Sequence, residues 1–158
     1  IAGIYMGKIR NWKEVGGPDR EIVVIDKERH RGTRLVFMQY IFGNASQRTP
    51  GTLLVTGSNN EEQAKIAQSD SAIGMLSLAW VNEEVKAVSI RDKGKEFLPT
   101  WEAVQQGRYP MVRKLNFITS GEPEGEMKAF IDFMTGEEGQ KIVGESGYIP
   151  IIKESSQP

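Results

Sequence analysis

One short stretch of the chain gathers most of the residues that could do chemistry. It reads KERHRGTR and occupies positions 27–34. A glycine lets the backbone approach a ligand closely, a threonine hydroxyl can donate a hydrogen bond, and lysine or arginine can neutralise an anion. The stretch therefore favours binding of an oxyanion. The candidate ligands are Lys27, Arg31, Gly32 and Thr33, with His30 and Arg34 as possible additions.

A simpler interpretation of the same stretch is a solvated basic loop whose Thr33 caps the next helix. A catalytic interpretation rests on His30, the only histidine, but no nucleophile motif accompanies it and the chain has no cysteine. A single histidine cannot form a multi-histidine metal site. We therefore expect no catalytic residue, no metal and no cofactor.

The elements on either side bear on these interpretations, because they position the stretch. Residues Glu21–Asp26 form a compact β-branched run, and apolar residues at helical spacing follow up to Gly43. We predict an interior strand over Ile22–Ile25 and a helix that begins near Gly32 and Thr33. The carboxyl end of a strand that leads into a helix N-terminus is a natural anion site in an open α/β sheet.

The rest of the chain alternates between strand and helix patterns, which predicts an α/β fold with a mixed sheet flanked by helices. Capping residues and first-turn acids predict a helix from Ser58 to about Ser69, and Thr100 opens a short helix that ends before Gly107. Strands are predicted over 71–81 and 83–90, as neighbours or a hairpin, and over 111–119. Two further helices are predicted after Pro123, the second over 137–146.

Size and composition exclude several classes of protein. The 158 residues can close one sizeable core, and 20 basic against 21 acidic residues give a formal charge of −1. This balance argues against nucleic-acid binding. The longest nearly apolar stretch, Ala72–Val81, is about half of the ~20 residues that a bilayer-spanning helix needs. The chain begins at Ile1 without a basic-then-apolar leader, so we expect any export signal to lie outside it.

Several segments, in order, resemble one known family. Residues Met6–Asp19, MGKIRNWKEVGGPD, resemble the "GKItNWkeVGGpd" stretch of the phosphate-binding proteins of ABC transporters. Ala72–Leu78 resembles their "aIGYvsl" strand, and Val85–Val88 resembles their "vkal". Pro99–Thr100 and Gly107–Pro110 resemble a return segment, "PT…G.YP.sR", and 130–150 resembles "FidF…eGQ.iv…GYvP". The resemblance spans nearly the whole chain.

This resemblance implies a type 2 periplasmic binding-protein fold, in which two lobes close over a ligand. Residues 1–110 are expected to form an α/β domain similar to the family's second lobe, and residues 111–158 to form the returning C-terminal segment, a strand plus two helices. The N-terminal part of the first lobe has no counterpart among the matched segments.

The anion loop departs from the family pattern, "R-E-x-G-S-G-T-R". Aligned on the retained Gly32 and Thr33, this pattern places Lys27 at the anion-pairing arginine, His30 at the first glycine and Arg31 at the serine. A lysine cannot form the bidentate fork of an arginine, and Arg31 adds bulk and charge where the family has a hydroxyl. We therefore expect altered or weakened binding.

The resemblance implies a solute-binding module of an ABC importer rather than an enzyme. Its ligand would be phosphate or a similar oxyanion, its partner an ABC permease in the membrane, and its location extracytoplasmic, in the periplasm or at the cell surface. The alternative is a degenerate binding-protein-like domain that acts in protein interaction or sensing. Without a first lobe, apolar surface would be uncovered, which predicts a homodimer or docking on that lobe.

Overall fold

A three-stranded parallel sheet lies at the centre of the fold, in the order β2-β1-β3. In the computed structural model, which describes residues 1–151, β1 spans Val23–Lys27, β2 spans Leu54–Thr56 and β3 spans Ala72–Ile73. Ile25 pairs with Leu54 on one side, and Val24 pairs with Ile73 on the other. The predicted interior strand is confirmed. At the edge, β2 leaves its apolar side chains Leu54 and Val55 exposed.

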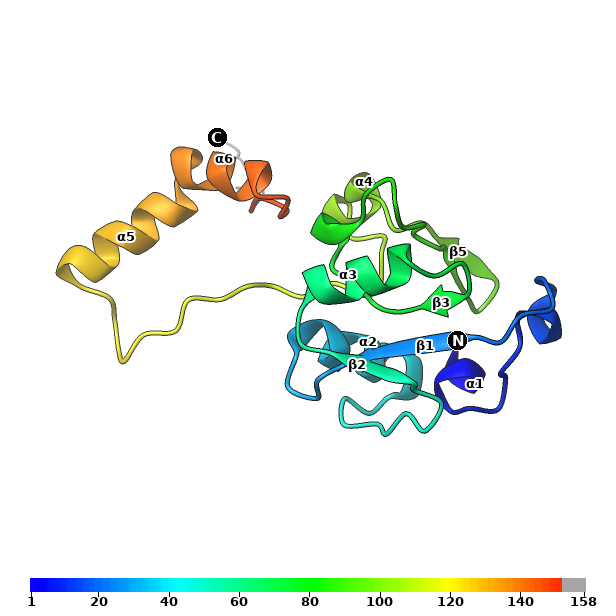
Figure 1. Cartoon of the computed structure of the whole chain (residues 1–158). Helices are drawn as coiled ribbons and strands as arrows, with labels where there is room; N and C mark the ends of the chain where they lie inside the picture. Colours follow the sequence, from blue (N-terminus) through cyan, green and yellow to red (C-terminus); the bar gives the residue numbers. More distant parts are fainter. Residues whose placement is uncertain (152–158) are drawn as a thin grey trace.

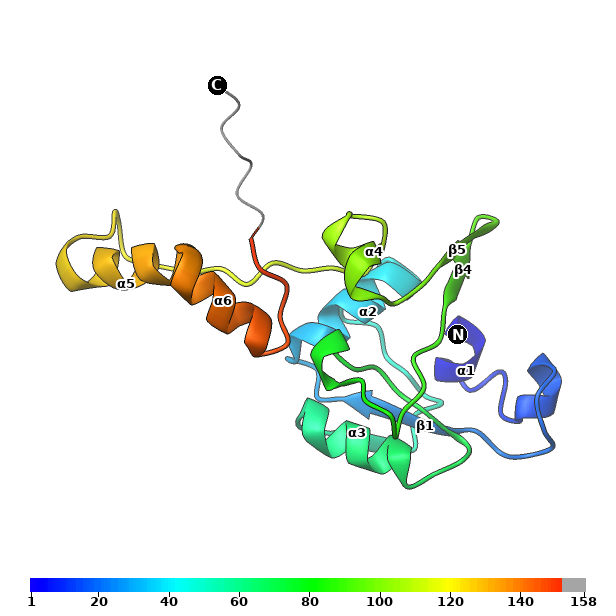
Figure 2. The same cartoon turned by 90° about the horizontal axis from the view of Figure 1, so that it is seen from above.

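Two helices cover the two faces of this sheet (Figure 2). Helix α2, Gly32–Phe42, connects β1 to β2, and α3, Asn59–Ala67, connects β2 to β3. Gly43 ends α2 with a φ of 67°, a left-handed conformation that glycine adopts without strain. The Ser58 hydroxyl caps α3 by accepting a hydrogen bond from the Glu61 N–H at 3.1 Å. The sequence predicted both helices, the end of α2 at Gly43 and the start of α3 at Ser58.

The remaining elements are short or lie near the chain ends (Figure 1). They are α1 (Ala2–Tyr5), η1 (Trp12–Val15), η2 (Leu78–Trp80), β4 (Ile90–Asp92), β5 (Lys95–Phe97), α4 (Trp101–Gln105), α5 (Gly125–Thr135) and α6 (Glu137–Glu145). The predicted helices at 100–107 and after Pro123 are confirmed. The α/β class is confirmed too, and antiparallel pairing occurs in the separate hairpin β4-β5 and in an isolated bridge between Asn11 and Glu21.

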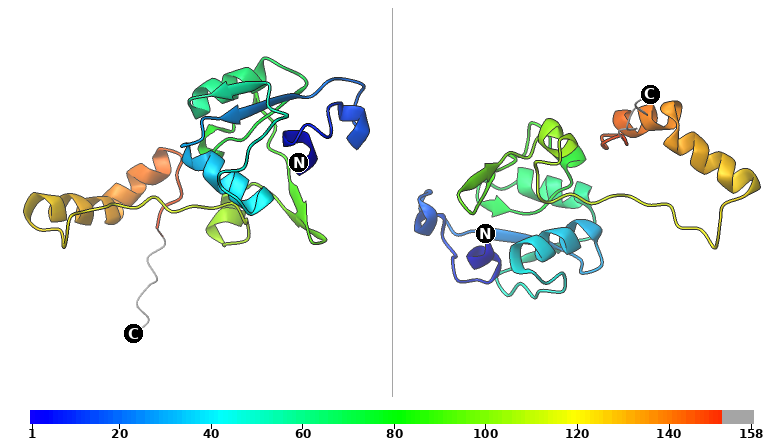
Figure 3. Two further views of the ribbon diagram at one scale, coloured as in Figure 1. Left: turned by 90° about the horizontal axis from the view of Figure 1, so that it is seen from below. Right: turned by 180° about the vertical axis from the view of Figure 1, so that it is seen from behind.

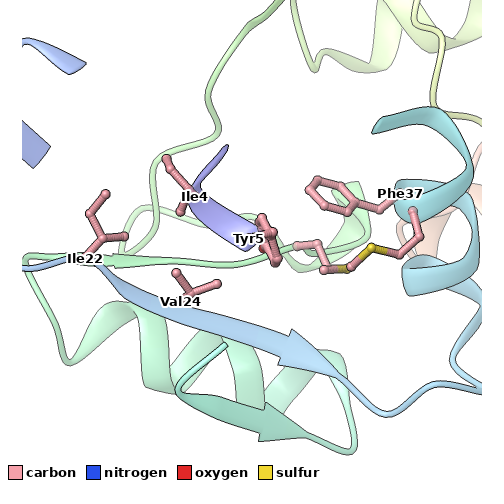
Figure 4. Packing of buried hydrophobic residues seen from close by; sticks show 7 residues of the cluster. Ile4, Tyr5, Ile22, Val24 and Phe37 are labelled. Carbon is pink, nitrogen blue, oxygen red and sulfur yellow. The ribbon is translucent and has the colours of Figure 1, made fainter. Parts of the chain in front are cut away.

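The core packs α1 and α2 against the sheet (Figure 4). The Tyr5 and Phe37 rings lie 5.1 Å apart at 55°, and the Tyr5 hydroxyl donates to the Ile25 carbonyl at 3.3 Å. Burial of the hydroxyl raises the pKa of Tyr5 well above its ordinary value. The buried cluster consists of Ile4, Tyr5, Ile22, Val24, Phe37, Met38 and Met75. This core fixes where β1 ends and α2 begins.

The predicted strands at 71–81 and 83–90 are wrong in extent. Only Ala72–Ile73 joins the sheet, because the Met75 N–H donates to the Glu62 carboxylate at 2.6 Å rather than to a strand. The hairpin forms later, over 90–97, around Lys93 and Gly94, which have φ angles of 47° and 78°. Two positive φ angles suit the tight turns that connect antiparallel strands.

The predicted strand at 111–119 is also wrong. This part of the chain is extended, but among residues 1–151 no strand pairs with it. It leads from the sheet-containing body to α5, which extends away from that body (Figure 3). The turn after α6 returns to the body, since Gly147 lies beside Ala79 of η2. Met111 packs against the core, but the apolar side chains that follow it are exposed, Ile118 by 93%. The division of the chain into 1–110 and 111–158 stays a prediction. The last seven residues of the second part, 152–158, lie outside the described residues.

Candidate anion-binding site

The stretch that the sequence singled out lies where two parallel strands end and two helices begin. Lys27, the last residue of β1, pairs with Thr56, the last residue of β2. Helix α2 begins at Gly32 and α3 begins at Asn59, each a few residues after its strand. The N-termini of both helices therefore face the carboxyl edge of the sheet, as predicted for α2. The positive ends of two helix dipoles favour an anion here.

Side chains from three elements meet at this edge. The Thr33 and Ser77 hydroxyl oxygens are 3.2 Å apart, and the Asn59 amide nitrogen donates to the Ser77 hydroxyl at 3.3 Å. Thr33 lies on α2, Asn59 on α3, and Ser77 directly precedes η2. All three are half-buried. This cluster presents rotatable hydroxyl donors beside the first turn of α2.

The first turn of α2 offers backbone donors as well. The first intrahelical hydrogen bond runs from the Leu35 N–H to the Arg31 carbonyl at 3.0 Å. The N–H groups of Gly32 and Thr33 precede this bond, so the helix supplies no acceptor for them. Arg31 at the N-cap makes no side-chain capping bond. These N–H groups and the nearby hydroxyls can together bind one oxyanion.

Lys27 points into the protein rather than toward this edge. Its ammonium forms an ion pair with Glu62 and donates to the Ser58 carbonyl at 3.2 Å, and both charged side chains are at most 2% exposed. Burial raises the pKa of the Glu62 carboxyl, although Lys27 and the Met75 N–H oppose the shift. Lys27 thus neutralises an internal carboxylate, and an anion ligand role for it stays a prediction.

Arg34 is buried too, in a second ion pair. Its Nε donates to Asp26 Oδ1 at 2.9 Å, and a terminal nitrogen donates to Asp26 Oδ2 at 3.1 Å. The Thr49 hydroxyl donates to the same carboxylate at 2.6 Å, and Arg34 also donates to the Gln47 carbonyl at 2.8 Å. The guanidinium therefore fastens loop 44–51 to β1 and α2. Its positive charge is neutralised by the buried Asp26 carboxylate.

The two remaining sequence candidates lie at the surface. Arg31 Nε donates to Glu28 Oε2 at 3.2 Å, and His30 Nε2 lies 3.6 Å from the same oxygen. The His30 side chain is 74% exposed. Glu28 thus offsets part of the positive charge at the rim. Of the six candidates, the structure brings Arg31, Gly32 and Thr33 together at the helix start.

Sequence reasoning missed Ser77 and Asn59. Asn59 lies at the predicted start of a helix, and Ser77 lies within the strand predicted over 71–81. The signal that could have found them is positional, since Asn59 opens a helix after one strand and Ser77 follows the next. Carboxyl ends of neighbouring parallel strands meet at one edge of a sheet. Which of these residues contact a ligand stays a prediction.

Comparison with known proteins decides the family. The model of the PBP superfamily domain matches residues 1–138. The chain belongs to the PBP superfamily. The family predicted from the sequence motifs is confirmed, and with it the fold class.

Relatives of this PBP superfamily chain are named as phosphate-binding proteins. The chain is 36% identical to phosphate-binding protein PstS of Bacillus subtilis over 94% of its own length and 48% of the relative. Identity to PstS of Borreliella burgdorferi is 32%, over 96% and 56%. The chain therefore spans about half the length of the curated relatives it matches.

Solved structures similar to this chain are also named as phosphate transport proteins. A phosphate ABC transporter substrate-binding protein from Clostridium perfringens, solved with bound phosphate, matches with a TM-score of 0.75 and 32% identity, over 96% of this chain and 60% of that one. An ABC-type phosphate transport receptor from Vibrio cholerae matches with a TM-score of 0.69 and 29% identity, over 95% and 61%. These names are those of binding proteins and receptors, in line with the expectation of a module that is not an enzyme.

Two further searches of the described residues bear on function. Within residues 1–151, no three side chains of His, Cys, Asp or Glu gather closely enough to hold a metal ion. In the same range, no helix has the length and apolar character that crossing a bilayer requires.

Proposed function

We propose that this chain is the oxyanion-binding part of an ABC importer's solute-binding protein, with phosphate as its ligand. The observation that carries the proposal is the meeting of Thr33, Asn59 and Ser77 at the exposed N-terminus of α2. The match to a structure with bound phosphate, at 32% identity over nearly the whole chain, supports the choice of ligand.

The chemistry of the site follows from its donors. Backbone N–H groups donate to phosphate oxygens, whereas a hydroxyl can either donate to an oxygen or accept from a protonated one. Arg31 adds a positive charge at the rim, which Glu28 partly offsets. Because this half-open edge stays wet, ion pairing there contributes about 1 kcal/mol at contact distance. We propose that binding by this chain alone is weak and decreases with added salt.

Replacing the Thr33 hydroxyl tests the site directly. Thr33→Val keeps the side-chain shape but removes a donor, and hydrogen bonds to charged groups contribute about 1.5–3 kcal/mol, so phosphate affinity should fall about tenfold or more. Titration of the ¹⁵N-labelled chain with inorganic phosphate should shift the Gly32 and Thr33 amides in the wild type. Thr135→Val, at the end of α5, is the matched control and should titrate like the wild type. Equal affinity for Thr33→Val would contradict the proposed ligand site.

The partner and location follow from the same proposal. A solute-binding protein delivers its ligand to a permease, so we propose an ABC permease as the membrane partner and an extracytoplasmic location for this chain. The second candidate function, protein interaction or sensing, is favoured by a different observation, the exposed apolar side chains of residues 112–118 and α5. If the chain does not bind phosphate but still associates through those residues, that result would support the second candidate.

These apolar residues also predict self-association of the chain. The Phe117 and Phe130 rings contact edge to face at 6.0 Å, yet both remain about half exposed, as is Phe133. Uncovered apolar patches find partners, so sedimentation should show dimers that increase with concentration. Phe130→Asp with Phe133→Asp should shift the equilibrium to monomers, whereas Lys128→Ala on the same helix should not. A monomer at every concentration would count against this expectation.

A further inference from the structure

A second arginine reaches the start of α2 from a distant part of the chain. Arg113 belongs to the extended segment that leads to α5, and its side chain is exposed. A Cβ atom built on Gly32 would collide with the Arg113 guanidinium, with one terminal nitrogen at only 2.8 Å. The guanidinium therefore lies directly over the first residue of α2. Any side chain at residue 32 would displace the guanidinium from this position.

This position is electrostatically unfavourable unless an anion is present. The start of α2 carries the positive end of the helix dipole, and Arg31 adds a further charge beside it. Among residues 1–151, Arg113 takes part in no ion pair, whereas Lys27, Arg31 and Arg34 each have a carboxylate partner. Arg113 is thus a cation over the start of α2 whose charge no described carboxylate offsets; Arg29, in the loop before α2, also takes part in no ion pair among residues 1–151. An oxyanion on the Gly32 and Thr33 N–H groups would offset the charge of Arg113.

We propose that Arg113 is a specificity-determining ligand of the bound oxyanion and closes over it from the return segment. The inference rests on the proposed function and deepens it. Arg113 supplies the planar fork that Lys27 lacks, and Lys27 is in any case paired with Glu62. A guanidinium binds two oxygens of phosphate or a similar tetrahedral anion at once. Through these contacts, the bound anion would connect the segment around residue 113 to the first turn of α2.

Three variants of the full chain test this role in ¹⁵N titrations with inorganic phosphate. Arg113→Ala should weaken binding about tenfold, because a charge-assisted bidentate contact is lost. Arg113→Lys should recover only part of the affinity, since it restores the charge without the fork. Lys114→Ala removes the neighbouring exposed cation and should bind like the wild type, which separates a specific contact from the general effect of charge.

Two further measurements follow the contact itself. In the wild type, the Arg113 Nε resonance should shift together with the Gly32 amide during the titration. Gly32→Ala should displace the guanidinium and lose the Nε shift while the amide spectrum of the fold is retained. Because Arg113 is exposed on an extended segment, none of these variants removes a core contact.

The outcomes distinguish this inference from the proposed function. If the wild type does not respond to phosphate, the proposed function fails and takes this inference with it. If the wild type binds and Arg113→Ala binds equally well, the inference alone is overturned. Equal losses in Arg113→Ala and Lys114→Ala would also overturn it, because they would show a nonspecific effect of positive charge.

Discussion

Lys27→Met should lower the free energy of unfolding by about 3–5 kcal/mol near pH 8. The substitution leaves the Glu62 carboxylate, which is fully buried, without its ionic partner. The remaining donors are the Met75 N–H at 2.6 Å and the Thr56 hydroxyl at 3.2 Å. Two hydrogen bonds do not replace a cation in a buried site, so the folded state bears the cost of an uncompensated charge.

The loss should depend on pH in a definite direction. Burial already raises the pKa of Glu62, and Lys27 is the charge that opposes the rise. Without Lys27 the folded-state pKa rises further above the unfolded value, so the folded state holds a proton over a wider range. Stability then falls as the pH increases through that range, by at most about 1.4 kcal/mol per pH unit. Denaturant unfolding should therefore show a smaller loss at pH 5 than at pH 8.

Lys65→Met is the matched control, since Lys65 is exposed on the same helix as Glu62. It should change stability by no more than about 0.5 kcal/mol at either pH. Lys27→Met combined with Glu62→Leu should recover much of the stability, because an apolar pair leaves no buried charge. A pH-independent loss in the single variant would contradict this account of the pair.

Arg34→Leu should have an effect of similar size, about 3–5 kcal/mol, at the second buried pair. It removes both arms of the fork on Asp26 and the bond to the Gln47 carbonyl, while Thr49 still donates to the carboxylate. Loop 44–51 should also loosen, which hydrogen exchange would detect as lower protection of the Gly51 amide, a donor to the Tyr5 carbonyl at 2.9 Å.

Two variants keep this prediction specific. Arg34→Lys retains the charge without the fork and should fall between the wild type and Arg34→Leu. Arg48→Leu removes an exposed arginine from the same loop and should leave stability within about 0.5 kcal/mol. An Arg48→Leu loss as large as that of Arg34→Leu would show that the loop is sensitive to any lost cation.

Local patterns predicted the body of the fold well. The β-branched run before Asp26, the capping Ser58 and the terminating Gly43 each act within a few residues, so sequence alone reveals them. The strand predicted over 111–119 failed because pairing depends on a partner elsewhere, which local alternation cannot report.

The sequence predicted the strand end and the helix start that flank the candidate site, but not which cations turn inward. Lys27 and Arg34 look like ligands in a basic loop, yet each pairs with a buried carboxylate. Residue spacing does not show which cations turn inward, since Glu62 is far from Lys27 in the sequence and meets it only through the parallel pairing of β1 and β2. The position of Arg113 beside Gly32 is likewise a contact between distant parts of the chain, which residue spacing does not show.

The exposed edge of the sheet has a consequence for handling the protein. Strand β2 lies within the segment TLLVT, residues 52–56, which is uncharged, lacks proline and keeps Leu54 and Val55 in solvent. Such segments nucleate cross-β aggregation when neighbouring structure opens. Pro50 and Gly51 precede it and Gly57 follows it, so the ladder that could grow from this edge is short. Partial unfolding at high concentration is therefore the condition under which this chain should form fibrils.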